Sequence, residues 1–98
     1  MGVSVILEHF DGEEIKRLSK VFSPTSYENW QSKKFKILRY IDPYDDTTFN
    51  SLMCKDFIND LEELRKEESS DKEQIAELLE MAEMCVNEPH TYIKFYGD

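Results

Sequence analysis

Two amphipathic stretches joined by a short polar connection constrain the fold of this chain more than any other feature. The first covers residues 51–67 and the second covers residues 70–87. Each has apolar side chains at the three- and four-residue spacing of one helix face. The first stripe consists of Phe57, Ile58, Leu61 and Leu64, preceded by Met53 and Cys54. The second consists of Ile75, Leu78, Leu79, Ala82, Cys85 and Val86. The short connection predicts antiparallel helices that pack as a helical hairpin.

Alternating apolar and polar residues predict strands on both sides of this helical pair. Such segments are residues 3–7, 35–41 and 90–96. Asp11-Gly12 is a turn signal after the first of them. Residues 13–20 fit either a helical step or the return strand of a hairpin, and we favour an irregular hairpin. The chain therefore reads as a single domain over residues 1–98, an α+β fold with a small antiparallel sheet and an αα-hairpin packed on one face.

Residues 41–50 contain a dense group of turn-forming side chains. Pro43 fixes its own backbone and favours an extended residue before it, so a strand should end near Asp42. The residues suited to cap the following helix are Thr48, Asn50 and Ser51. The structural interpretation is a strand-to-helix connector held by its own aspartates. The functional interpretation is an exposed acidic tip that binds a cation or a basic protein.

The charge of the chain excludes several classes of partner. The formal net charge is -9. Residues 1–41 carry seven Lys/Arg and five Asp/Glu, a balance of +2, and residues 42–98 carry five and sixteen, a balance of -11. Such a surface repels nucleic acids and anionic membranes, which need cationic contacts. It attracts basic proteins and accelerates their association.

The residue types needed for catalysis or cofactor binding are sparse. With only three glycines, the sequence has no phosphate-binding loop and no dinucleotide fingerprint. Cys54, Cys85, His9 and His90 are too scattered to predict a zinc site. We therefore expect no enzyme activity, no cofactor and no metal. The start of the chain lacks the features of a secretion signal, so we expect a cytoplasmic protein with reduced, buried cysteines.

Two segments of the chain resemble a family of small bacterial proteins. Residues 42–47 read D-P-Y-D-D-T, and residues 95–98 read F-Y-G-D. The family has a D-P-Y-G-D-T turn, a helical pair rich in Leu and Glu, and a last aromatic-rich strand that ends in Gly-Asp. The resemblance covers roughly residues 34–98, with Asp45 in place of the family's glycine. In size and acidity the chain is also similar to immunity proteins that neutralise toxins in contact-dependent and other interbacterial competition.

The resulting hypothesis is an immunity protein that occludes a basic toxin domain, which could be a nuclease. The residues expected to bind this partner are Asp42, Asp45, Asp46, Glu62, Glu63 and Glu80, with Tyr44 and Tyr96 as aromatic anchors. Aromatic residues of the strands are a further candidate contact surface, namely Phe10, Phe35, Tyr40, Tyr92, Phe95 and Tyr96. The alternative is a housekeeping interaction or regulatory module, which could form a homodimer through the free sheet face. A small hydrolase using Asp42 or Asp46 is the least favoured hypothesis.

Overall fold

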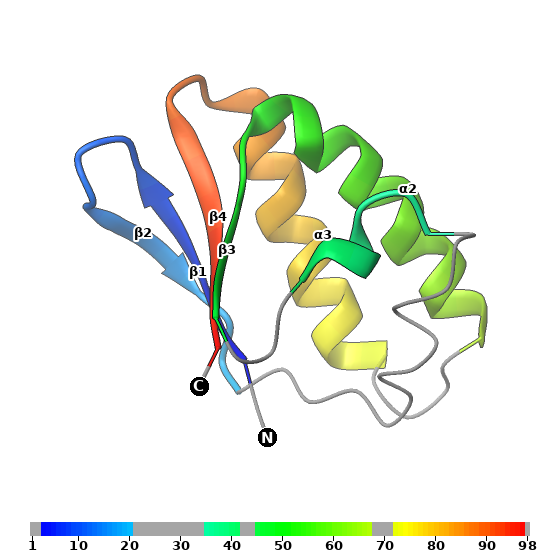
Figure 1. Cartoon of the computed structure of the whole chain (residues 1–98). Helices are drawn as coiled ribbons and strands as arrows, with labels where there is room; N and C mark the ends of the chain where they lie inside the picture. The colour runs from blue at the N-terminus through cyan, green and yellow to red at the C-terminus, as the bar shows by residue number, and fades with distance from the viewer. Residues whose placement is uncertain (1–2, 21–34, 42–44, 68–71, 98) are drawn as a thin grey trace.

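The structure is a computed structural model that describes residues 3–20, 35–41, 45–67 and 72–97. It has a four-stranded antiparallel sheet with two helices packed against one face (Figure 1). The strands are β1 (Ser4–His9), β2 (Glu14–Arg17), β3 (Asp46–Phe49) and β4 (Thr91–Tyr96). The helices are α2 (Ser51–Glu67), α3 (Lys72–Asn87) and the short 3-10 helix η1 (Leu38–Tyr40). The predicted α+β fold with an αα-hairpin on one face of the sheet is confirmed.

The order of strands in the sheet is β2-β1-β4-β3, so the first and last strands pair at its centre. Val5 of β1 lies opposite Phe95 of β4, and Phe49 of β3 lies opposite Ile93. These four side chains are buried and face the helices. The predicted alternation of β4 is confirmed, because Thr91, Ile93 and Phe95 are buried while the residues between them are partly exposed.

The core joins the sheet to the helical pair through three aromatic rings. Phe49, Phe57 and Phe95 contact one another edge to face, with centroid distances of 5.0 to 5.5 Å. Edge-to-face packing of this kind adds to the free energy gained from burying the rings themselves. Cys54 of α2 and Cys85 of α3 are free and fully buried in the same cluster, as predicted.

The N-terminus of α2 is capped by one of the predicted residues. Asn50 Oδ1 accepts a hydrogen bond from the N–H of Met53 at 2.9 Å, and Asn50 O accepts one from Cys54 at 2.9 Å. The side chain thereby satisfies a donor that has no partner within the helix. None of the helices in the described part of the chain combines the length and apolar character that a membrane span requires.

The prediction of a return strand after the Asp11-Gly12 turn is confirmed. Gly12 has φ of +92°, a left-handed conformation that glycine adopts without steric penalty. Its N–H donates to His9 O at 2.8 Å, which closes the turn. β2 then pairs with β1, with an irregularity between Leu7 and Glu8. Residues 13–20 are therefore not helical.

The predicted strand over residues 35–41 is wrong. The segment contains η1, and the buried carboxylate of Asp60 on α2 accepts three of its backbone N–H groups. The donors are Lys36 at 3.1 Å, Ile37 at 2.6 Å and Leu38 at 3.0 Å. These hydrogen bonds replace the ladder that a strand would need. The apolar residues of the segment are still buried in the hydrophobic core.

The interpretation of residues 46–49 as part of a connector is also wrong. These residues form β3, which pairs with β4 at one edge of the sheet. Asp45 continues this pairing, because its carbonyl oxygen accepts the N–H of Gly97 at 3.1 Å. The proposed turn at residues 42–44 lies outside the described residues.

Candidate protein-binding surface

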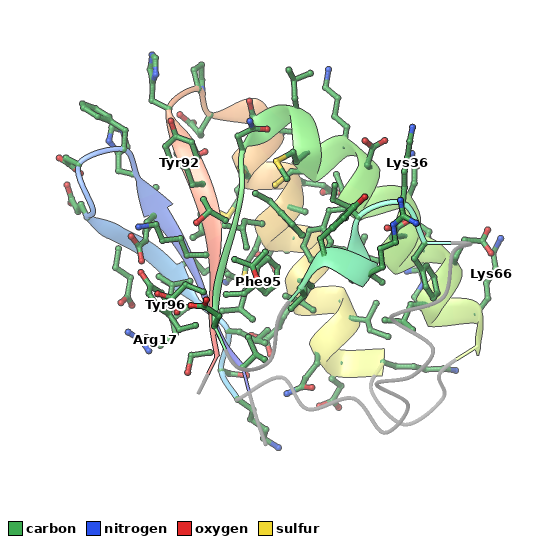
Figure 2. All side chains as sticks on the ribbon, viewed as in Figure 1. Arg17, Lys36, Lys66, Tyr92, Phe95 and Tyr96 are labelled. Atoms are coloured by element: carbon green, nitrogen blue, oxygen red, sulfur yellow. The ribbon has the colours of Figure 1, made fainter. Side chains whose placement is uncertain are left out.

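The face of the sheet away from the helices is covered by its own polar side chains. Tyr92, Tyr96 and Arg17 lie on this face, whereas Phe95 points towards the helices (Figure 2). At its centre is Glu8, which is only 7% exposed. Tyr96 Oη donates a hydrogen bond to Glu8 Oε2 at 2.5 Å, and Lys94 Nζ lies 3.6 Å from Glu8 Oε1. The buried carboxylate is therefore paired on both oxygens.

This network changes the acidity of the tyrosine. The hydrogen bond to Glu8, assisted by partial burial and by the negative charges of Glu8 and Asp46, raises the pKa of Tyr96 to about 12. The Tyr96 hydroxyl and one Glu8 carboxylate oxygen are therefore occupied by this hydrogen bond, in which Tyr96 Oη is the donor. The polar groups at the centre of this face are therefore paired with one another.

The acidic residues at the start of β3 meet the end of β4. Asp46 lies directly opposite Tyr96 in the ladder, so two of the predicted site residues come together. Asp45 Oδ1 accepts the N–H of Asp46 at 2.8 Å, which uses one carboxylate oxygen within the backbone. Asp45 and Asp46 are both exposed. The predicted site residues Asp42 and Tyr44 lie outside the described residues.

The three predicted glutamates of the helices do not form one surface with this pair. Each has a cationic neighbour of its own: Glu62 with Arg65, Glu63 with Lys66 at 3.5 Å, and Glu80 with Lys16 at 3.7 Å. Glu80 lies on the side of β2, whereas α2 contacts β3 and β4. Because β2 and β3 are opposite edges of the sheet, the predicted residues are spread over separate parts of the molecule.

Helix α3 has the largest net negative charge of any element in the described chain. It carries four glutamates and a single basic residue, Lys72. Glu77 is held by Ser19, whose N–H and Oγ donate to it at 3.2 and 2.6 Å, and these bonds hold the pKa of Glu77 below its usual value. Glu73 and Glu83 are exposed and have no ion-pair partner among the described residues.

A second surface lies where the β1–β2 turn, the start of α2 and the α3–β4 turn come together. We call it the loop-end surface, and it consists of Phe10, Leu52, Pro89, His90 and Tyr92. Phe10 is 65% exposed and Leu52 is 72% exposed. The rings of Phe10 and His90 are 5.9 Å apart, which joins the β1–β2 turn to the α3–β4 turn.

Two open depressions flank Tyr92 within the loop-end surface. The larger, of about 370 Å³, is lined by His9, Phe10, Asp11, Gly12, Thr48, Tyr92 and Lys94. The smaller, of about 290 Å³, is lined by Asn50, Ser51, Leu52, Pro89, His90, Thr91 and Tyr92. The tyrosine thus separates two shallow hollows, each bordered by a highly exposed apolar side chain.

The sequence names Phe10 and Tyr92 as contact candidates but does not point to Leu52. One signal was available, because Leu52 is an apolar residue in the first turn of α2 that falls outside the apolar stripe. The other aromatic candidates divide as follows. Phe35 and Phe95 are core residues, and Tyr40 is exposed beside Arg39, whose guanidinium carbon lies 4.9 Å from the centre of the ring.

Within the described residues, no three His, Cys, Asp or Glu side chains gather closely enough to hold a metal ion. No protein-family model, curated protein or solved structure matches this chain.

Proposed function

We propose that this protein is an acidic, cytoplasmic immunity protein that binds a basic toxin domain and blocks it by occlusion. The observation that carries this proposal is the excess of carboxylates on α3. This helix contains four glutamates and only one lysine, in a chain with a formal net charge of -9. Such a surface steers cationic partners into contact and repels anionic ones.

The mechanism needs no chemical step by this chain. A toxin domain that acts on nucleic acid must present Lys and Arg side chains to phosphates. Carboxylates such as Glu73 and Glu83, which are exposed and lack a described ion-pair partner, can bind those cations in place of phosphate. Occlusion follows when this protein covers the surface of the toxin domain that would contact its substrate.

The homodimer alternative would use the face of the sheet away from the helices. That face has the charged and polar cluster of Glu8, Lys94 and Tyr96 at its centre. Permanent homodimer interfaces are more apolar than this. The proposal of a heterologous basic partner therefore agrees better with the arrangement of side chains.

The test is co-expression with the product of the gene next to that of this chain. We expect the neighbouring product to arrest growth alone, and growth to recover when the two are produced together. A stable complex should also elute as one species in size-exclusion chromatography. A non-toxic neighbour, or a toxic one that neither binds nor is neutralised, would refute the immunity function.

A further inference from the structure

We propose that the loop-end surface docks a cationic segment of the protein partner, with an apolar side chain of that segment seated against Tyr92. This inference rests on the proposed function and assigns the place where the partner binds. It is distinct from the expected acidic residues that the structure describes, which lie at or just before the start of β3 and on α2 and α3.

The apolar part of this surface is available for binding. Phe10 and Leu52 are 65% and 72% exposed, so neither contributes much to the core. They border the two depressions that share Tyr92. Large apolar or aromatic side chains that enter a concave, desolvated contact supply most of the binding free energy in protein interfaces. A partner side chain lying over Tyr92 would bury both Phe10 and Leu52.

The surface is also held in a fixed shape. Thr91 Oγ1 donates to Glu88 O at 2.6 Å and lies 3.3 Å from Cys85 O, which fixes the α3–β4 turn to the end of α3. His90, in the same turn, has φ of +68°, a backbone conformation that residues other than glycine rarely adopt. Backbone outliers of this kind cluster at binding sites. A preorganised turn loses little conformational entropy when a partner binds.

The charge around the surface decides which partner fits. Asp11 and Glu13 in the β1–β2 turn and Glu88 in the α3–β4 turn are exposed carboxylates. Among the described residues, the only ion-pair partner of the three is His9, whose Nδ1 lies 3.8 Å from Asp11. Lys94 also lines the larger depression, but its charge is paired with Glu8. An apolar centre with these exposed carboxylates around it is complementary to a segment that combines apolar side chains with Lys or Arg.

The test uses a short synthetic peptide that alternates lysine with leucine. A peptide of the same charge with serine in place of leucine is its control. Amide ¹H–¹⁵N chemical shifts of the full chain would map the contact, and titration calorimetry would give Kd. We expect the largest shift changes at residues 9–13, 50–52 and 88–92, and we expect the serine peptide to bind at least about tenfold more weakly.

Variants test the same assignment in the protein. Phe10→Ser and Leu52→Ser should each weaken binding of the leucine peptide about tenfold. Ile15→Ser and Tyr40→Ser, which alter the other exposed large apolar residues in the described part of the chain, should leave Kd unchanged. The triple variant Asp11→Asn, Glu13→Gln and Glu88→Gln should weaken binding. The control is the triple variant Glu62→Gln, Glu63→Gln and Glu80→Gln, which removes an equal number of negative charges at other positions and should weaken binding less. Unchanged urea midpoints would show that the variants fold.

The outcomes separate this inference from the function on which it rests. If the adjacent gene product binds the protein but Phe10→Ser and Leu52→Ser keep full affinity, the docking surface is wrong and the immunity function stands. If neither the gene product nor the leucine peptide binds, both are wrong. Shift changes confined to α3 and to the part of α2 after residue 52 would overturn the docking surface as well.

Discussion

Glu8 and Tyr96 are joined by a side-chain hydrogen bond on the outer face of the sheet, although 88 positions separate them in the chain. The bond bridges the two central strands, because Glu8 lies on β1 and Tyr96 on β4. It also makes one tyrosine a reporter of the native fold.

Tyr96 should titrate at an unusually high pH in the native protein. Its pKa is raised to about 12 by the hydrogen bond to Glu8, against about 10 in an unfolded chain. A raised native pKa means that this stabilisation is complete below pH ~10 and is lost as pH rises towards ~12. Absorbance of tyrosinate should show a late step that is missing in Tyr96→Phe. The step should move towards ~10 in Glu8→Gln, and no movement there would mean that Glu8 is not its cause.

Asp60 should be one of the most sensitive polar residues of the chain. Asp60→Ala removes the acceptor of three backbone N–H groups in residues 36–38. Because buried donors without partners are costly, we expect a loss of about 3 kcal/mol in the free energy of unfolding, measured by urea denaturation. Asp56→Ala on the same helix is the control, since its partner is an exposed lysine, and should stay within about 0.5 kcal/mol of wild type. Equal effects of the two changes would contradict the anchoring role of Asp60.

Cys54 and Cys85 should be unreactive in the native protein. Both are fully buried and free. The hydrogen bond with Cys85 and burial raise the pKa of the Cys54 thiol, whereas the same hydrogen bond lowers the pKa of Cys85 to about 7. Complete burial therefore decides the outcome for Cys85, because iodoacetamide must reach the sulfur to react. We expect no adduct under native conditions and two adducts after denaturation without a reductant, as seen by mass spectrometry. A denatured protein with no adducts and a mass lower by the two thiol hydrogens would reveal a disulfide instead.

Reversing the charge of the helices should slow association with a basic partner. Glu62→Lys, Glu63→Lys and Glu80→Lys together change the net charge by six, from -9 to -3. We expect kon to fall about tenfold or more at low salt, and the rates of variant and wild type to converge towards ~1 M salt. Stopped-flow fluorescence measures both.

This variant needs a control at constant net charge. Each reversal also places a lysine beside an existing cation, and the pairs that are lost contribute only a few tenths of a kcal/mol each. The exchange Glu63→Lys with Lys66→Glu keeps both the net charge and the pair, and it should keep kon. A rise in the triple variant's koff with an unchanged kon would contradict steering and indicate direct contact.

His90 should prefer replacement by glycine to replacement by alanine. Its φ of +68° is unfavourable for any side chain with a Cβ. Because glycine adopts this conformation without the penalty, His90→Gly should be about 1 kcal/mol more stable than His90→Ala. Gly12→Ala is the converse case: space for a Cβ is open, yet φ of +92° should still reduce stability by about 1 kcal/mol. Urea midpoints test both, and equal stability of the His90 variants would contradict the strain.

The helices and the last strand could be predicted from the sequence because local spacing decides them. The stripe from Phe57 to Leu64 and the alternation of Thr91, Ile93 and Phe95 follow the periods of a helix and a strand. Residues 35–41 could not be assigned, since their backbone donors are satisfied by Asp60, which lies more than twenty positions away. A hydrogen bond of that kind leaves no trace in the local pattern.

The candidate surfaces were less accessible to sequence reasoning. Opposition of Asp46 and Tyr96 depends on the register of β3, and β3 itself consists of residues that resemble a turn. The ion pairs of Glu62, Glu63 and Glu80 determine how much of the acidic charge is free, and one of them joins different elements of the fold. Exposure of Leu52 follows from the way α2 rests on the sheet, which the sequence does not specify.

The pairing of β1 with β4 also sets the order in which the protein can mature during synthesis. A ribosome completes the β1–β2 hairpin first and both helices next, but residues 91–96, which must enter between β1 and β3, emerge after every other strand. A hairpin alone is marginally stable in water, so the nascent chain carries an open strand edge until residues 91–96 have emerged. The insertion of β4 between β1 and β3 therefore closes this edge only after both helices have been synthesised.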